Sequence, residues 1–168
     1  MKLSNIVINN FFLNNDIKGY CLSADELKKP NIEYRTFIYN YDDSNGKGSH
    51  WILIYFKPIK HLLSYKPYNH IAYYFDSSGA FPEFWEEKIN NGYDTNFIKY
   101  MKKYSKEIIY NNVMIQPPNS DTCGYYCCIA AYYFVKLNYT LKDFIKIFDE
   151  YDLYANDILI KNIYKILK

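Results

Sequence analysis

The chain has 168 residues, of which 49% are hydrophobic and 20% aromatic, and its formal net charge is +2. A chain of this length can bury one substantial core, so we expect a single domain that covers residues 1–168. The small net charge does not by itself indicate a nucleic-acid-binding protein, and neither a membrane span nor a secretory signal is predicted, because no long uncharged apolar run occurs.

The first half of the chain predicts short helical segments and a set of strands. A helix is expected over residues 3–12, and the capping-box pattern of residues 23–26 predicts a helical turn that stops at Pro30. β-branched and aromatic residues predict strands over residues 35–40, 50–56 and 70–75. Polar segments that contain Gly or Pro separate them, and Asp76-Ser-Ser-Gly79 follows the last one.

The second half of the chain predicts mainly helices. Their expected ranges are 82–90, 94–106, 123–137, 140–148 and 153–167, with one further strand over residues 108–115. The helix from residue 123 is apolar enough to be buried, and the last helix is amphipathic. The expected inward face of the last helix carries Ile158, Leu159, Ile163, Ile166 and Leu167. Because adjacent strands are followed by separate helices, the predicted fold class is α+β.

A cysteine lies where a loop meets the predicted buried helix. Ser120 and Asp121, which come just before it, are residue types that favour helix N-caps. Cys123 is therefore expected on the first turn, where unpaired backbone N–H groups and the positive end of the helix dipole favour a thiolate over a thiol. A thiolate held in this way is a candidate nucleophile.

A nucleophilic cysteine needs a base, a residue that orients this base, and donors for an oxyanion. The chain contains three histidines, His50, His61 and His70. All of them precede Cys123, so the catalytic order must be histidine first and cysteine last. His50 is the preferred base because it stands at the boundary between a polar loop and a strand. Asp76, at the end of a later strand, is the candidate that orients His50.

Gln116 lies seven residues before Cys123, at the end of a predicted strand. Its side-chain amide could donate a hydrogen bond to an oxyanion. An ordinary structural role stays open for each of these positions. The simpler interpretations are a surface histidine at His50, a turn-forming carboxylate at Asp76 and an exposed amide at Gln116.

The other cysteines are Cys21, Cys127 and Cys128. Their spacing does not form a disulfide framework, so a reducing, intracellular setting is favoured. Cys127 and Cys128 are predicted to pack as small apolar residues of the buried helix. No Cys-x-x-Cys or His-x-x-x-His pair completes a metal site, so the sequence requires neither a metal nor another cofactor.

Three motifs, taken together, resemble those of the adenain-like cysteine proteases of adenoviruses, virophages and large DNA transposons. The motifs are Gly48-Ser-His50-Trp51, Tyr74-Phe-Asp76 and Gln116-Pro-Pro-Asn-Ser-Asp-Thr-Cys123-Gly124-Tyr-Tyr-Cys127-Cys128. The SUMO-deconjugating proteases of the same clan share His-Trp, Asp and Gln…Cys-Gly, but the third motif is closer to the adenoviral branch. The resemblance runs over residues 10–137.

The resemblance implies a papain-related fold with a rearranged chain order, in which helices pack on a central, mostly antiparallel sheet and the nucleophile begins a buried helix. It implies Cys123 as nucleophile, His50 as general base and Asp76 as the residue that orients His50. Gln116 and the backbone N–H of Cys123 would form the oxyanion hole. The substrates would be viral capsid and core precursor proteins, cut at Gly-containing sites during maturation, in the virion and the infected host cell. The enzyme is expected to be a monomer.

The adenoviral proteases also use a peptide activator and DNA as cofactors. Residues 106–115 lack the cysteine that would bind such a peptide covalently, and Asp76 stands where those proteases have Glu. Lysines that could contact DNA lie on one predicted helix and near the C-terminus: Lys99, Lys102, Lys103, Lys106, Lys161, Lys165 and Lys168. DNA binding stays a hypothesis beside the simpler interpretation of a solvated surface.

Two alternatives to a maturation protease stay open. The first is a deubiquitinase or SUMO-type deconjugating protease, which a ubiquitin- or SUMO-derived probe would label. The second is a non-catalytic, capsid-associated module, in which Cys123 would not react with iodoacetamide at neutral pH.

Overall fold

The computed structural model describes residues 2–26, 34–42, 44–46, 48–59, 70–84 and 97–168. The described strands are β1 (Gly19–Leu22), β2 (Thr36–Asn40), β3 (Trp51–Pro58), β4 (His70–Phe75) and β5 (Glu107–Tyr110). The described helices are α1 (Asn5–Asn14), the 3₁₀ helix η1 (Ala24–Glu26), α3 (Phe97–Tyr104), α4 (Cys123–Val135), α5 (Leu141–Ile145) and α6 (Leu153–Leu167). Most of the helix expected over residues 82–90 and the start of that over 94–106 lie outside the described residues.

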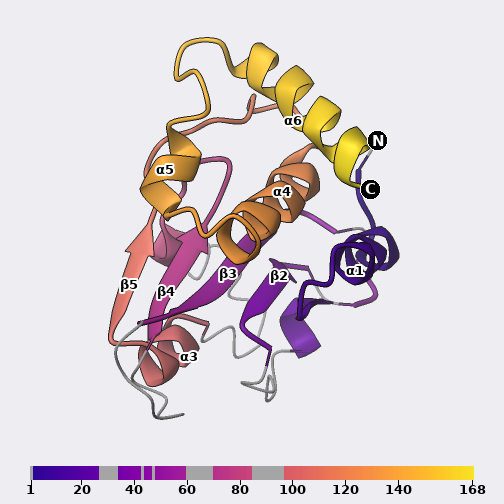
Figure 1. Cartoon of the computed structure of the whole chain (residues 1–168). Helices are drawn as coiled ribbons and strands as arrows, with labels where there is room; N and C mark the ends of the chain where they lie inside the picture. Colours follow the sequence, from indigo (N-terminus) through magenta and orange to yellow (C-terminus); the bar gives the residue numbers. More distant parts are fainter. Residues whose placement is uncertain (1, 27–33, 43, 47, 60–69, 85–96) are drawn as a thin grey trace.

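The five strands form one sheet in the order β1-β2-β3-β4-β5 (Figure 1). β3 runs antiparallel to both of its neighbours, whereas β1 pairs in parallel with β2 and β5 pairs in parallel with β4. The expected α+β class is confirmed, and the sheet is mixed, with antiparallel pairs in the centre and parallel pairs at both edges. β1 was not predicted, because four residues are too few to show a hydrophobic period.

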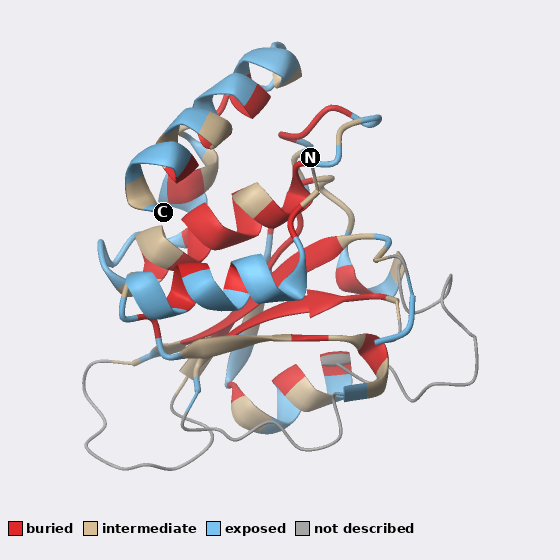
Figure 2. Cartoon of the chain, turned by 90° about the vertical axis from the view of Figure 1, so that its right-hand side faces the viewer, coloured by how far each residue is buried: buried red, intermediate tan, exposed pale blue. Residues whose placement is uncertain are grey.

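Helices cover both faces of the sheet, and β3 is therefore buried along six consecutive residues. Side chains of a strand alternate between the two faces. The odd-numbered residues of β3 from 51 to 55 belong to a core that includes α4. The even-numbered residues from 52 to 56 belong to a second core, to which Ile98 and Met101 of α3 contribute. Figure 2 shows the buried strands between these two helical layers.

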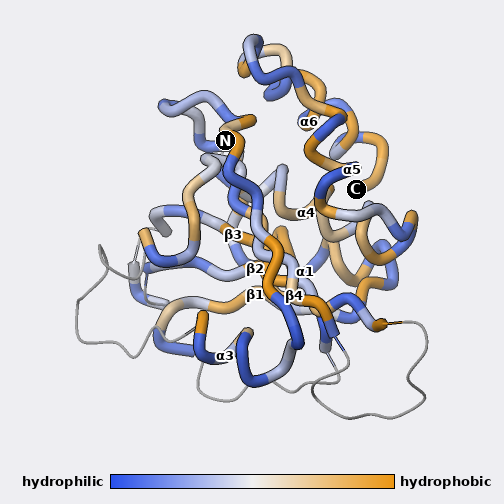
Figure 3. The backbone as a smooth tube through the Cα atoms, turned by 90° about the vertical axis from the view of Figure 1, so that its left-hand side faces the viewer, coloured by the Kyte–Doolittle hydropathy of each residue, from blue (hydrophilic) through white to orange (hydrophobic). Residues whose placement is uncertain are grey.

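α4 is the central helix, and nine of its thirteen residues are buried. A helix that is apolar around most of its circumference must be covered on more than one side. β3 lies beneath α4 and α6 lies above it (Figure 1), and Figure 3 shows that the hydrophobic stretches of the backbone include α4 and the central strands. The first residue of this helix is Cys123, which is thereby fixed at the end of a well-packed element.

α6 has the expected boundaries, but part of its predicted inward face is wrong. Three residues expected to face the core are exposed: Ile158, Leu159 and Ile166. The buried positions are instead Asn156, Asp157, Ile160 and Tyr164. Two polar residues can take inward positions because their side chains are hydrogen-bonded to the segment that precedes α4. Ile163 and Leu167 do pack against the core, as expected.

The N- and C-terminal helices meet at one side of the molecule (Figure 1). Phe11 of α1 stacks on Tyr164 of α6, with ring centroids 5.2 Å apart, and the side-chain amide of Asn15 donates to the carbonyl of Leu167 at 3.0 Å. No helix within the described ranges is both long enough and apolar enough to cross a bilayer.

Candidate active site

His50 and Asp76 meet because two strands pair. β3 and β4 are antiparallel, with Leu53 opposite Phe75. The residue before β3 and the residue after β4 therefore lie at the same end of this strand pair. Nε2 of His50 donates to Oδ1 of Asp76 over 2.7 Å. The Asp76 side chain is fully buried, while that of His50 is 12% exposed. The structure therefore brings together the predicted base and the carboxylate predicted to orient it.

Asp76 is held by its own turn and by a segment that crosses it. Its Oδ1 also accepts from the backbone N–H and the hydroxyl of Ser78, at 2.8 and 2.7 Å. Asn111 accepts from the backbone N–H of Asp76 at 3.0 Å and donates to its carbonyl at 2.6 Å. Gly79 completes the turn with φ +73°, and a Cβ there would lie 2.6 Å from the backbone nitrogen of Met114. Glycine is thus required for the close approach that brings Asn111 to Asp76.

The surroundings of His50 favour its protonated form. Burial by itself lowers the pKa of this histidine, but hydrogen bonds with Asp76 and Cys123 outweigh burial and raise the pKa of His50 to about 10. Because Asp76 occupies Nε2, Nδ1 is the ring nitrogen that remains for the sulfur. At neutral pH the imidazolium form of His50 therefore dominates.

Cys123 is the first residue of α4 and only 3% exposed, and its side chain lies within hydrogen-bonding reach of His50. The other thiols lie in different surroundings. Burial raises the pKa of all three, those of Cys21, Cys127 and Cys128. Cys127 and Cys128 are fully buried and pack in the core, as predicted. Cys123 is therefore the thiol with a histidine partner and a place at a helix start, the two features that make a cysteine nucleophilic.

Three hydrogen bonds fix Gln116. Its backbone N–H donates to the carbonyl of Ser77 at 3.1 Å, and the hydroxyl of Ser77 donates to Oε1 at 2.5 Å. Nε2 donates to the carbonyl of Ser120 at 2.8 Å. A carbonyl can only accept, so this contact determines which end of the amide is nitrogen. One N–H of Nε2 remains beyond this bond, and it is the donor that could bind an oxyanion.

Gln116 does not end a strand, contrary to the prediction for residues 108–115. β5 stops at Tyr110, and residues 111–115 have no regular secondary structure. The reason is that the side chain of Asn111 pairs with the backbone of Asp76, and this takes the chain out of the sheet. The backbone N–H groups of Ile115 and Gln116 both donate to Ser77 instead. Gln116 is thereby tied to the turn that carries Asp76.

The expectation that Ser120 or Asp121 caps α4 is wrong. The N-cap residue is Thr122, and its side chain makes no capping hydrogen bond. The hydroxyls of Ser120 and Thr122 donate to the carboxylate of Asp157 in α6 instead, at 2.5 and 2.7 Å. The first turn of α4 therefore keeps backbone N–H groups that no side chain caps, among them that of Cys123, which lacks an intrahelical acceptor.

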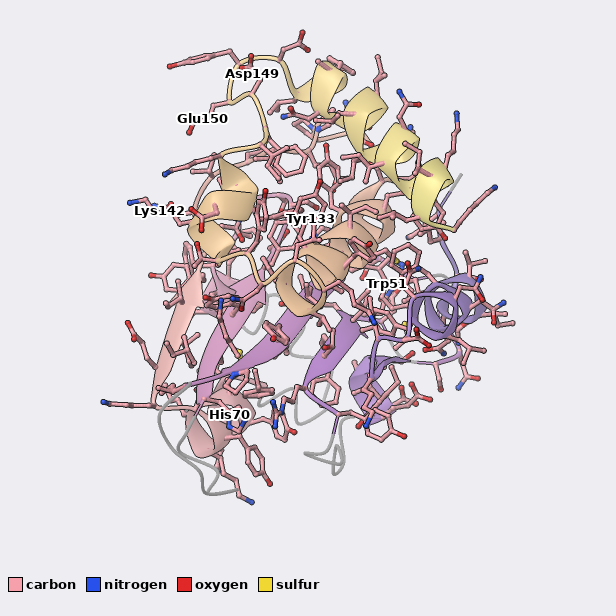
Figure 4. All side chains as sticks on the ribbon, viewed as in Figure 1. Trp51, His70, Tyr133, Lys142, Asp149 and Glu150 are labelled. Atoms are coloured by element: carbon pink, nitrogen blue, oxygen red, sulfur yellow. The ribbon has the colours of Figure 1, made fainter. Side chains whose placement is uncertain are left out.

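Trp51, next to His50, packs beside the start of α4. Figure 4 shows this side chain between α4 and α1. Its Nε1 donates to the carbonyl of Leu3 at 3.1 Å. A Cβ on Gly124 would lie 3.0 Å from the Cβ of Leu3 and 3.3 Å from Cδ1 of Trp51, so a larger residue would press on both. A cavity of about 150 Å³ lies between the N-terminal segment and the loop before His50, lined in part by Trp51 and Gly48.

No group of three or more metal-ligating side chains occurs among the residues that the structure describes. The lysines proposed to contact DNA lie in two places. Lys161 and Lys165 belong to α6, which packs on α4, and Lys161 lies 4.0 Å from Asp157. Lys99, Lys102 and Lys103 are exposed on α3, which covers the opposite face of the sheet from α4 (Figure 1). They lie on the other side of the sheet from Cys123.

Comparison with solved structures gives a likeness to the ASFV pS273R protease, with a TM-score of 0.52 at 16% sequence identity. The alignment covers 86% of this chain and 61% of that one, so the chain spans less than two thirds of the protease. This likeness shows a shared fold. The SUMO protease Ulp1, with its catalytic cysteine oxidised to a sulfenic acid, aligns at a TM-score of 0.40 and 15% identity over 97% of this chain and 79% of that chain. No protein-family model matches the sequence, and no curated protein is significantly similar to it.

Sequence reasoning named the four central residues but missed those that hold them. Ser77 and Ser78 lie in the polar tetrapeptide after β4, so their position at a strand end was a usable signal. Asn111 was hidden inside a predicted strand. Asp157 lies in the last predicted helix, where the hydrophobic pattern indicated that other, apolar residues face the core. A hydropathy pattern does not show where an inward polar residue will find a partner.

Proposed function

We propose that the protein is a cysteine endopeptidase, in which Cys123 is the nucleophile and His50 the general acid and base. The observation that carries this proposal is the position of His50 between Asp76 and Cys123, with a pKa raised to about 10. That value keeps the imidazole protonated at neutral pH and stabilises a thiolate beside it. The fold shared with the ASFV pS273R protease supports the same reaction class.

The first step is attack by Sγ of Cys123 on the carbonyl carbon of the scissile peptide, which forms an S–C bond and an oxyanion. The remaining N–H of Gln116 and the backbone N–H of Cys123 donate to this oxyanion. When the C–N bond breaks, the imidazolium of His50 gives its proton to the leaving amine. The product of this half-reaction is a thioester between Cys123 and the substrate, with a neutral His50.

The second step hydrolyses the thioester. Neutral His50 takes a proton from water, and the resulting hydroxide adds to the thioester carbon. The second oxyanion rests on the same two donors, and its collapse releases the acid and the thiolate of Cys123. Asp76 accepts from Nε2 throughout, and this keeps Nδ1 directed at the sulfur and the substrate.

For the substrate class, we infer viral structural precursors that are cut during particle maturation. The segment from Gln116 to Cys128 supports this inference through its resemblance to the adenain-like proteases, and the shared fold with a protease of a virus is consistent with it. Cleavage at Gly-containing sites is part of the same inference and rests on the same resemblance. The compartment would be the infected cell and the assembling particle.

The test is cleavage of a peptide library derived from viral capsid and core precursors, with new N-termini mapped by mass spectrometry. Wild-type protein is expected to cut a defined set of sites, and Cys123→Ala is expected to cut none while its circular dichroism spectrum stays unchanged. Cys128→Ala is the matched control, because it removes a buried thiol of the same helix that has no histidine partner among the residues that the structure describes. Turnover by Cys123→Ala at the wild-type rate would overturn the assignment.

The same purified protein can be used to distinguish the two alternative functions, a deconjugating protease and a non-catalytic module. Labelling of Cys123 by a SUMO- or ubiquitin-derived C-terminal probe, without cleavage of capsid peptides, would assign the protein to deconjugation. Absence of cleavage together with a Cys123 that iodoacetamide does not alkylate would show that the site is not a catalytic one.

A further inference from the structure

The carboxylate of Asp157 lies at the centre of a buried hydrogen-bond cluster beside the loop that joins Gln116 to Cys123. Its Oδ2 accepts from the hydroxyl of Ser120 at 2.5 Å, and its Oδ1 accepts from that of Thr122 at 2.7 Å. The phenol of Tyr126 donates to the same Oδ1 at 3.1 Å. Asp157 itself is 8% exposed, and Lys161, the one cation paired with it among the described residues, lies 4.0 Å from Oδ2.

The two ends of this loop carry the two proposed oxyanion donors. At the first end, the amide of Gln116 donates to the backbone carbonyl of Ser120, the residue whose hydroxyl Asp157 holds. At the second end, Thr122 directly precedes the backbone N–H of Cys123. A single carboxylate therefore holds the residue that Gln116 contacts and the residue before Cys123, and the hydroxyls of these two residues also lie 2.6 Å from each other.

Asn156, which precedes Asp157 in α6, contacts the residue just before this loop. The side-chain amide of Asn156 donates to the carbonyl of Ile115, the residue before Gln116, at 3.1 Å. The phenol oxygen of Tyr126 lies 3.0 Å from the same carbonyl, so its single hydrogen is shared between this carbonyl and Asp157. The start of α6 thus contacts the chain on both sides of the proposed oxyanion hole, and Figure 1 shows α6 lying over α4.

We propose that Asp157 is a positioning residue, which acts through Ser120 and Thr122 to hold the amide of Gln116 and the backbone N–H of Cys123 at the spacing that an oxyanion requires. The proposal rests on the proposed function. The hydroxyls of Ser120 and Thr122 would serve as N-cap acceptors in most helices, and here they donate to Asp157. The helix start that carries the nucleophile is thereby anchored from outside the helix.

The test compares two reactions of Cys123, of which only one forms an oxyanion. Acylation by a p-nitrophenyl ester passes through an oxyanion and releases p-nitrophenolate, whereas alkylation by iodoacetamide displaces iodide at a CH₂ carbon and forms none. In Asp157→Ala, the acylation rate is expected to fall roughly tenfold while the alkylation rate stays within about twofold of wild type, because displaced donors lose much of their effect.

Asp152→Ala is the matched control. Asp152 caps α6 by accepting from the backbone N–H of Ala155 at 2.9 Å, so its loss weakens the same helix without touching the loop. Both rates are expected to stay at the wild-type level in this variant. Asp157→Asn, which keeps the shape and one acceptor oxygen, is expected to recover part of the lost acylation.

A second comparison shows whether Asp157 acts through Gln116. If it does, adding Asp157→Ala to Gln116→Ala costs much less acylation than it costs in the wild-type background. An equal loss of acylation in both backgrounds would show that Asp157 does not act through Gln116. Its effect would then be limited to the backbone N–H of Cys123. Where Asp157→Ala does not fold, as judged by circular dichroism, Ser120→Ala takes its place, with a smaller expected loss of acylation.

The outcomes separate this proposal from the proposed function. Loss of acylation with intact alkylation supports the positioning role, even in a protein that cuts no library peptide. An equal fall in both rates, or no fall in either, overturns it, even in a protein that cleaves the library well.

Discussion

The two halves of the site are built in different ways. The half that contains His50 and Asp76 sits on adjacent strands of one sheet, and its supports, Ser78 and Asn111, come from the turn and the segment next to it. The half that contains Gln116 and Cys123 sits on a loop and a helix start. Ser77, in the turn after β4, holds Gln116. The support of the helix start comes from Asp157, a residue 34 positions farther along the chain than Cys123.

Under the proposed function, the difference separates two roles within one reaction. The sheet half would supply the acid and base, because hydrogen bonds with Asp76 and Cys123 raise the pKa of His50. The loop half would hold the two donors that bind the oxyanion. Damage to the first half should therefore affect every reaction of the thiol, whereas damage to the second should affect only reactions that form an oxyanion.

The largest effect is expected from His50→Ala, which removes the sheet half. Peptide turnover should fall on the order of 10⁴-fold, because general acid–base catalysis and thiolate formation are lost together. Alkylation of Cys123 by iodoacetamide at pH 7 should fall in parallel, as followed by mass spectrometry. His70→Ala, at the far end of β4, is the control and should change neither rate. Undiminished alkylation in His50→Ala would show that the thiolate does not depend on this histidine.

An intermediate effect is expected from Gln116→Ala, which removes one donor of the loop half. Peptide turnover should fall on the order of 100-fold, the usual cost of one oxyanion-hole donor, and KM should change little. Alkylation at pH 7 should stay at the wild-type rate. A parallel loss of alkylation and turnover would contradict the division of the site into two halves.

The smallest effect concerns stability as a function of pH. The pKa of His50 is raised from 6.5 to about 10 in the folded protein, so His50 holds its proton more tightly in the folded than in the unfolded state. The contribution of His50 to the free energy of unfolding should be complete below about pH 6.5 and should be lost as the pH rises toward about 10. Urea unfolding between pH 6 and 10 should therefore show a steeper loss in wild type than in His50→Gln. Parallel curves for the two proteins would contradict the raised pKa.

The sheet half could be predicted from the sequence because its signals are local. His50 and Asp76 each border a strand rich in β-branched and aromatic residues, and antiparallel pairing of such strands brings opposite ends together. The strand predicted over residues 70–75 has the bounds that β4 has in the structure. Cys127 and Cys128 were predicted as core residues for the same reason, because the apolar run around them is long enough to be recognised.

The supports of the loop half could not be predicted, because they depend on contacts between distant segments. Ser120 and Thr122 have side chains that cap helices or bind a carboxylate equally well, and only the position of α6 decides between the two roles. Ile158 and Ile166 are a second case: they are exposed although the hydrophobic pattern predicted that they are buried. Hydropathy favoured burying them, but the hydrogen bonds of Asn156 and Asp157 determine which face of α6 turns inward.

The contacts of Asn156 and Asp157 also set an order of assembly for a chain that is synthesised from its N-terminus. His50, Asp76 and Cys123 are all made before α6, so a nascent chain can complete the sheet and dock α4 first. The loop between Gln116 and Cys123 acquires its last hydrogen bonds only when α6 folds over it. A chain that stops short of residue 157 would lack the contacts of Asp157 with Ser120 and Thr122, so we expect its acylation rate to be reduced, as in Asp157→Ala, until the final helix is in place.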